Sequence, residues 1–124
     1  MKSLCATISM VVVITMAPLS AALAASSNFK SSQANGAIAY HRDSGSYGYT
    51  TDQKNSRSAK TEALKQCNHP KCEVVASFRG ACGAVANGPK RFAAITAATR
   101  QEAETKALRK CGDACTVAVW ACTK

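Results

Sequence analysis

Cysteine has the widest choice of chemistry in this sequence, because a thiol can form a disulfide, bind a metal or carry a redox reaction. The pairs Cys67/Cys72 and Cys111/Cys115 enclose four and three residues, whereas a zinc knuckle usually encloses two. His69 lies inside the first pair and has no counterpart in the second. A redox pair would open a helix, whereas these pairs follow predicted helices. We therefore predict no metal ligand, and six structural cysteines: Cys67, Cys72, Cys82, Cys111, Cys115 and Cys122.

The residue types of a hydrolase triad occur together at the first predicted turn, as His41, Asp43, Ser44 and Ser46. A triad needs its nucleophile, base and orienting acid in one geometry. Successive residues of a strand point to opposite faces, and the segment 43–45 is explained as a turn. The other carboxylates are dispersed or serve as helix caps. We therefore expect no catalytic residue and no cofactor.

Residues 1–24 have the layout of a secretory signal peptide, with a basic start, an apolar run and a small-residue cleavage pattern at 22–24. Pro18 interrupts the run, which disfavours the alternative of a membrane anchor. We expect a protein exported to the periplasm or the extracellular space, with no stable membrane anchor after Cys5 leaves with the signal. In that oxidising compartment the six remaining cysteines form three disulfides, each contributing about 2–4 kcal/mol.

The sequence is strongly basic, with sixteen Lys and Arg against seven Asp and Glu. Without Lys2 of the predicted signal, fifteen basic residues remain and the mature chain has a net charge of +8. The charges are scattered and aromatic residues are few, so nucleic-acid binding is not favoured. An acidic protein partner, the envelope surface or solubility each account for the charge. Candidate partner contacts are Lys54, Arg57, Lys60, Lys65, Arg79, Lys90 and Arg91.

The mature chain contains an internal repeat. Residues 25–35 are typical of a flexible leader, and residues 36–124 are predicted to form a single disulfide-rich domain. Its halves, 36–82 and 83–124, are each expected to contain a strand, a strand, a helix and a strand. The repeated residues are Ala59, Ala63, Leu64 and Cys67 in the first half and Ala103, Ala107, Leu108 and Cys111 in the second.

Capping residues predict the helix boundaries. Asn55 or Ser56 can cap the first helix. Thr99 and Glu102 form a capping box for the second helix, and Gly112 is suited to its left-handed C-terminal cap.

The last strand of each half is expected to alternate between two faces. Val74, Ala76 and Phe78 would then share one face. Phe78 and Trp120 occupy corresponding places and are interpreted as core anchors.

The predicted fold class is α+β. We expect the two β-β-α-β repeats to form a mainly antiparallel sheet of about six strands, with both helices on one face. Six cysteines allow fifteen pairings, so the connectivity is a hypothesis. The proposed bonds are Cys67–Cys72 and Cys111–Cys115, which each join a helix end to the next strand, and by elimination Cys82–Cys122.

Three blocks of sequence carry a family resemblance: 72–78 followed by 82–86, the hairpin strand 37–40, and 98–104. The last block continues through 107–108, Cys111, Gly112, Cys115, Val117, Trp120 and Cys122. Together they resemble the domain of unknown function 4189 family over essentially the whole mature chain, although 92–94 departs from its more aromatic members. The resemblance implies a small exported bacterial domain without a family-wide activity or a defined active site, so no functional residue is carried over.

These observations favour an exported, non-catalytic protein-binding domain, most concretely an inhibitor or immunity-type partner in the bacterial envelope. One alternative is a secreted effector that acts on a host or competitor cell. A second alternative is an envelope enzyme, for which we would expect a deep pocket around His41.

Overall fold

The computed structural model describes residues 33–124. The predicted signal peptide (1–24) and residues 25–32 of the predicted leader lie outside the described residues. The order strand, strand, helix, strand occurs twice, which confirms the predicted α+β class and its two β-β-α-β repeats. The elements are β1 (Asn35–His41), β2 (Ser46–Gln53), α1 (Ser56–Cys67), β3 (Glu73–Arg79), β4 (Cys82–Asn87), β5 (Phe92–Ala97), α2 (Arg100–Cys111) and β6 (Thr116–Cys122).

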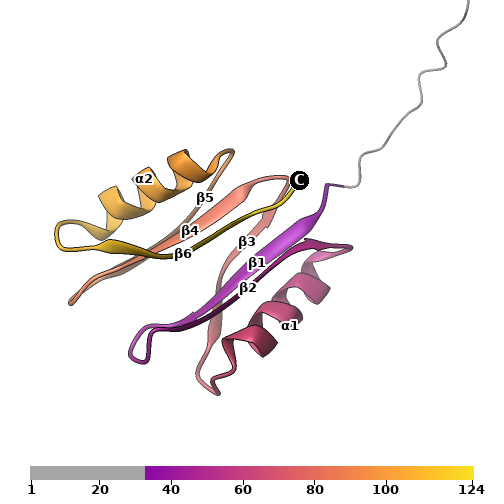
Figure 1. The fold of residues 1–124 in the computed structure, drawn as a ribbon, viewed down its shortest axis with the longest axis horizontal. Coiled ribbons are helices and arrows are strands. Elements are labelled where there is room, and N and C mark those ends of the chain that lie inside the picture. The colour runs from indigo at the N-terminus through magenta and orange to yellow at the C-terminus, as the bar shows by residue number, and fades with distance from the viewer. Residues whose placement is uncertain (1–32) are drawn as a thin grey trace, which may run out of the picture.

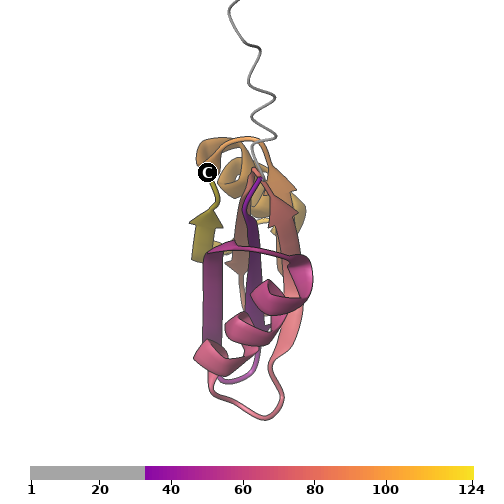
Figure 2. The ribbon, with the colours of Figure 1, turned by 90° about the vertical axis from the view of Figure 1, so that its right-hand side faces the viewer.

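The six strands form two three-stranded antiparallel sheets, in the orders β2-β1-β3 and β5-β4-β6. This differs from the expected single sheet with both helices on one face. The two sheets lie face to face, and α1 and α2 cover opposite outer faces (Figure 1). The turned view also shows the helices in different parts of the molecule (Figure 2). The fold is therefore a four-layer helix–sheet–sheet–helix sandwich.

The central strands, β1 and β4, explain why there are two sheets. Ala37 of β1 packs in the cluster under α1, whereas Ile38 packs between the sheets. In β4, Ala84 packs under α2 and Val85 packs between the sheets. A strand that is apolar on both faces must be covered on both faces. A single sheet with helices on one face would leave Ile38 and Val85 exposed to water.

Small residues allow α1 and α2 to approach the sheets closely. Ala59 and Ala63 of α1 are fully buried, and α2 buries its equivalent alanines. A Cβ atom on Gly48 of β2 would overlap the backbone of Ala63 and Cys67. The helix backbone therefore lies directly on β2, with no room for a side chain between them.

A register shift in β3 lets this strand contribute side chains to two hydrophobic clusters. Ile38 pairs with Ala76, and the next residue of β1, Ala39, pairs with Val74. Val74 consequently packs with the cluster under α1, whereas Ala76 and Phe78 face the other sheet. The expected placement of all three on one face was wrong, because this β-bulge inserts an extra residue. β6 has the same kind of shift opposite β4.

Phe78 joins the two halves. It is only 5% exposed, as its predicted role of core anchor requires. Its ring lies against Gly36 of β1 and Gly83 of β4, and a Cβ atom on either glycine would overlap the ring. One aromatic side chain therefore fills a space that is bounded by the first strand of each repeat.

The ends of the described domain meet the junction between its halves. Gly80 N donates to Ala34 O at 3.2 Å, and Thr123 N donates to Ala81 O at 2.9 Å. Ala81 N also donates to Thr123 Oγ1 at 3.0 Å. Thr123 lies against Gly36 at the start of β1. The first strand, the last strand and the β3–β4 connection are thus held together at one end of the sandwich.

Disulfides join the same three cysteine pairs that the sequence analysis proposed. Two of them close the loop between the helix and the last strand of each half. The third joins residues that lie directly opposite each other on β4 and β6, with Cα atoms 4.0 Å apart. The bonds are Cys67–Cys72, Cys111–Cys115 and Cys82–Cys122.

The helix caps agree with most of the predicted ones. Asn55 caps α1 by accepting a hydrogen bond from the first turn at 2.8 Å, and Thr99 caps α2 at 3.2 Å. Glu102 pairs with Lys106 at 2.6 Å instead of completing the capping box. Gly112 ends α2 with a positive φ of 98°, but its ψ of −168° differs from the left-handed helical cap that was predicted. No helix within residues 33–124 is long and apolar enough to span a membrane.

Candidate functional site

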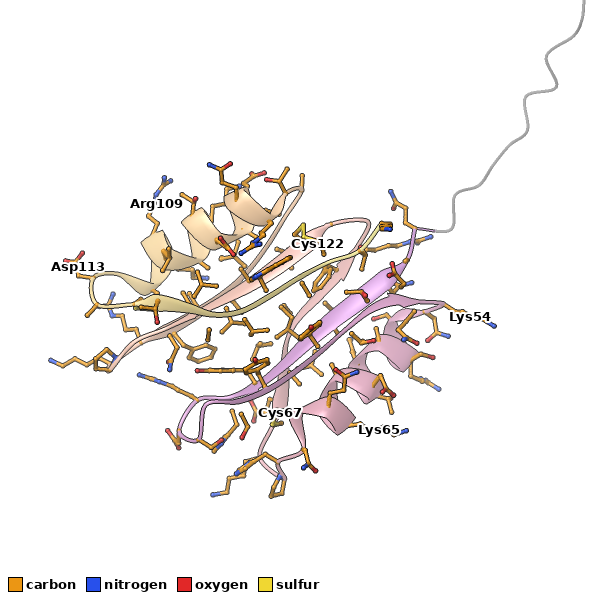
Figure 3. All side chains as sticks on the ribbon, in the orientation of Figure 1. Lys54, Lys65, Cys67, Arg109, Asp113 and Cys122 are labelled. Carbon is orange, nitrogen blue, oxygen red and sulfur yellow. A yellow bond between two sulfur atoms is a disulfide. The ribbon has the colours of Figure 1, made fainter. Side chains whose placement is uncertain are left out.

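The seven predicted basic contacts are exposed, but they do not form one patch. Lys54 and Lys65 point away from the body on the side of α1 (Figure 3). The contacts are distributed as follows: Lys54, Arg57, Lys60 and Lys65 in or just before α1, Arg79 at the end of β3, and Lys90 and Arg91 between β4 and β5.

A hollow of about 510 Å³ lies around His41, where an envelope enzyme would be expected to have its site. His41 stacks on His69, with ring centroids 4.2 Å apart and an interplanar angle of 14°. His41 Nδ1 lies 2.7 Å from Ser44 Oγ, which donates to Ser46 Oγ at 2.9 Å and accepts from Ser46 N at 3.2 Å. Nucleophilic attack by Ser44 would require its proton to be directed at His41. Ser44 Oγ lies within hydrogen-bonding distance of both His41 Nδ1 and Ser46 Oγ, in an exposed turn.

The cysteines near His69 are not available as metal ligands, because Cys67 and Cys72 are bonded to each other. The stacked rings of His41 and His69 place their in-plane lone pairs in nearly parallel planes, so the lone pairs do not converge on one point. Across residues 33–124, no group of three or more His, Cys, Asp and Glu side chains is arranged to hold a metal ion.

Tyr40 is the most perturbed ionisable group beside this hollow. It is 4% exposed, and its ring centroid lies 6.2 Å from that of Phe92. Burial raises the pKa of the Tyr40 phenol, while the positive charge of Arg42 and the side-chain amide of Asn87 act in the opposite direction. The neutral phenol is therefore the form that the fold favours.

A second hollow, of about 400 Å³, is bounded by aromatic side chains from both sheets. We call it the β6 groove; it is lined by Tyr47, Tyr49 and Thr51 of β2 and by residues 118–122 of β6. Tyr47 and Tyr49 are 48% and 44% exposed. They point away from α1, because the intervening Gly48 lies against that helix and residues of a strand alternate.

Trp120 also lines the groove and is 39% exposed. It lies opposite Ala84, which packs under α2, so the indole is on the outer face of its sheet. Arg100 Cζ lies 3.6 Å from the centroid of the indole ring, and Arg100 Nε lies 2.8 Å from Glu104 Oε1. The cation therefore stacks on the ring and restricts its orientation.

The prediction that Trp120 is a core anchor was wrong. β3 and β6 have the same burial pattern up to their last residue, which makes Trp120 equivalent to the exposed Ser77 and Ala121 equivalent to Phe78. The two disulfide loops differ in length by one residue. Counting from the start of each strand would have placed Trp120 on the surface.

The outer edge of β6 is open within the described part of the chain, where β6 pairs with β4 alone. Its sequence, Thr116–Cys122, contains no charged residue and no proline. Natural sheet edges are usually protected by charges, prolines or a covering element. The groove thus combines exposed aromatic rings with an unprotected strand edge.

The similarity of this chain to known proteins extends over the whole fold. A sequence model of the family described as "Domain of unknown function (DUF4189)" matches residues 35–122. Protein Rv1269c of Mycobacterium tuberculosis is 37% identical over 87 residues, which are 70% of this chain and 68% of that protein, and Protein Mb1300c of Mycobacterium bovis gives the same values. The NMR structure of Rv1813c from Mycobacterium tuberculosis matches with a TM-score of 0.59 and 26% identity, covering 98% of this chain and 97% of that one.

Proposed function

The chain belongs to the family of domain of unknown function 4189 (DUF4189), and on this premise we propose that it is an exported, non-catalytic protein-binding domain. Its most concrete form is an inhibitor or immunity-type partner in the bacterial envelope. The proposal rests mainly on one observation, the β6 groove.

The groove has the composition of a protein interface. Tyr and Trp are enriched at interfaces and among the residues that contribute most to binding energy, because they combine large apolar area with a polar group. Tyr47, Tyr49 and Trp120 come from two different sheets and line one hollow. Their exposure in a small domain leaves apolar surface that a partner would remove from water.

The charge favours an acidic partner. Residues 33–124 contain fourteen of the sixteen Lys and Arg, because Lys2 and Lys30 lie outside them, and all seven Asp and Glu. Their net charge is therefore +7. Basic residues scattered over the surface accelerate the approach of an acidic protein, whereas the aromatic groove supplies the contact itself.

The Cys82–Cys122 disulfide supports a binding role because it restrains one wall of the groove. Cys122 lies in the groove wall and is bonded to Cys82 on the neighbouring strand. A surface that is already ordered loses less conformational entropy when it binds.

Affinity capture with intact disulfides tests the proposal. The oxidised domain would be immobilised and exposed to periplasmic extract of the organism that encodes it. Trp120→Ala and Tyr49→Ala would each be compared with Leu64→Ala, which removes an exposed apolar side chain on α1, outside the groove. We expect the two groove variants to lose at least about tenfold in recovery of a specific protein, as is typical of an aromatic hot spot.

Leu64→Ala is the control, and it should recover the same protein as the unaltered domain. Equal recovery by all of the variants would remove the groove as the binding surface and would contradict the proposal.

A further inference from the structure

β6 forms one wall of the β6 groove and is also the outer strand of its sheet. Thr123 N donates to Ala81 O, so this pair of opposed residues is hydrogen-bonded. Successive residues of an antiparallel strand direct their backbone groups to opposite sides. Ala121 therefore faces β4. The N–H and C=O groups of Trp120 and Cys122 face the open edge.

The distance between β4 and β6 independently indicates the same orientation of the β6 backbone groups. The Cα atoms of Cys82 and Cys122 are 4.0 Å apart. Opposed residues lie about 4.5 Å apart in a non-hydrogen-bonded pair and about 5.5 Å apart in a hydrogen-bonded pair. Cys122 thus belongs to a non-hydrogen-bonded pair, and its backbone groups point away from β4. Trp120, two residues earlier, has the same orientation.

We propose that the open edge of β6 receives an extended, acidic segment of the partner protein as an added strand. The inference rests on the proposed binding function and specifies its mode. The added strand hydrogen-bonds to the outward backbone groups of Trp120 and Cys122. Its side chains alternate, so that one set meets Tyr47 and Tyr49 and the other set meets Trp120.

Charge selects this occupant over a second copy of the chain. Two copies would each bring a net charge of +7 from residues 33–124, and this like charge opposes their association. An acidic segment would instead lie near Lys124, which follows β6. It would also lie beside Arg100, which stacks on Trp120 and is also paired with Glu104. β6 itself has no carboxylate that would repel it.

Amide hydrogen exchange on the unaltered, oxidised domain tests the proposal directly. The probe is a synthetic peptide of alternating Glu and Val, with the same 7-residue length as β6. At saturating peptide we expect the amides of Trp120 and Cys122 to exchange at least about tenfold more slowly. The amide of Ala121, which already faces β4, should not change.

Two further peptides separate charge from strand formation. A peptide with Lys in place of Glu keeps the alternation, and a peptide with a central Pro cannot continue a strand. Both should protect Trp120 and Cys122 less. Three results overturn the proposal: unchanged exchange at these two amides with the Glu peptide, equal protection by the Lys peptide, or protection that grows with protein concentration in the absence of peptide.

A pair of variants isolates the backbone contribution. Trp120→Ala and Trp120→Pro both lose the indole, but only the proline variant also loses the outward N–H group. Proline is tolerated on sheet edges, so both variants should fold, and thermal unfolding would verify this. We expect the proline variant to bind the Glu peptide about fivefold more weakly than the alanine variant, as for one lost hydrogen bond.

The outcomes distinguish this inference from the binding function on which it rests. If the two Trp120 variants bind equally, and both bind more weakly than the unaltered domain, the aromatic groove binds but strand addition is wrong. If groove variants capture the partner as well as the unaltered domain does, the proposed function itself fails. Should the proline variant not fold, the exchange result on the unaltered chain decides.

Discussion

Tyr40 shows how the position of one side chain can disfavour its ionised form. Its ring lies between the two sheets, in the cluster that also contains Ile38 and Phe78. Ionisation would place a negative charge in that apolar layer, with Arg42 as the nearby positive charge that acts against the effect of burial. The folded state therefore disfavours ionisation of Tyr40.

Alkaline pH should destabilise the domain partly through Tyr40. Because the folded pKa is raised, this contribution to stability is fully present below the ordinary tyrosine value of about 10 and is lost as the pH rises through the folded pKa. Tyr40→Phe removes the ionisable group, so the variant should lose less melting temperature between neutral pH and pH above 10. Thermal unfolding across that range measures the difference.

Tyr47→Phe is the matched control, because Tyr47 is 48% exposed. This variant should follow the unaltered domain at every pH. If Tyr40→Phe loses as much stability at high pH as the unaltered domain, Tyr40 is not the group responsible.

The elements show what patterns along the chain can and cannot specify. The alanine stripes, Asn55, Thr99 and the cysteine spacing predicted both helices, their starts and the two local disulfides, since these depend on residues close in sequence. The Cys82–Cys122 bond, between residues 40 apart, was proposed only by elimination. The division into two sheets depends on Ile38 and Val85 being covered by strands from the other half. Alternating small apolar residues such as Ala37 and Ile38 fit one covered face or two, so the sequence pattern left this choice open.

The site was harder to predict than the fold for a related reason. The exposure of Trp120 follows from its register opposite Ala84 and from the position of α2, and neither is visible in local sequence. The basic residues that the sequence analysis selected are exposed, but exposure alone does not bring them together. The β6 groove depends on β2 and β6 meeting across the two sheets.

The contact between α1 and β2 should be intolerant of a single methyl group. Gly48→Ala places a Cβ atom on the backbone of Ala63 and Cys67, which can move only if the helix moves. We expect a loss of about 1–3 kcal/mol in the free energy of unfolding, as for other overpacked cores, or more if α1 cannot shift. Chemical denaturation measures the loss.

Gly45→Ala provides the comparison for Gly48→Ala. Gly45 has φ of 71° and nothing within 4 Å of an added Cβ atom, so only backbone strain of about 1 kcal/mol is expected there. A smaller loss at Gly48 than at Gly45 would show that the helix is not held against the strand as described.

The disulfides should differ in their contribution to stability. Cys82 and Cys122 are 40 residues apart in sequence, whereas Cys111 and Cys115 are 4 apart. The chain-entropy model gives about 4 kcal/mol for the long loop and about 2 kcal/mol for the short one. Double Cys→Ala variants of each pair, compared by denaturant unfolding, should show this order. An equal loss would mean that loop closure is not the main source of stabilisation.

At the scale of the whole molecule, the two repeats share one core and are expected to unfold together. Each half has its own helix and sheet, but Ile38, Phe78, Val85 and Val119 pack in a single cluster between the sheets. Neither half buries these residues alone. Separation of the sheets would expose the apolar layer of both, which couples their stabilities.

Phe78→Ala should therefore destabilise both halves at once. Loss of a buried Phe costs about 3–5 kcal/mol, and Phe78 lies against a glycine from each repeat. Trp120→Ala, which removes an exposed aromatic, should cost within about 1 kcal/mol. NMR signals from α1 and α2, followed through denaturation of the Phe78 variant, should disappear in one transition. Separate transitions for the two helices would show that the halves are independent.

Both ends of the described domain lie beside the β3–β4 connection, through hydrogen bonds among Ala34, Gly80, Ala81 and Thr123. This placement bears on the order in which the two repeats can follow each other along the chain. A short linker from residue 124 back to residue 33, with the chain cut between Gly80 and Ala81, would reverse the order of the two repeats and preserve every strand pairing. Such a circular permutant keeps the groove and all three disulfides. We therefore expect the fold to form with either repeat first in the chain.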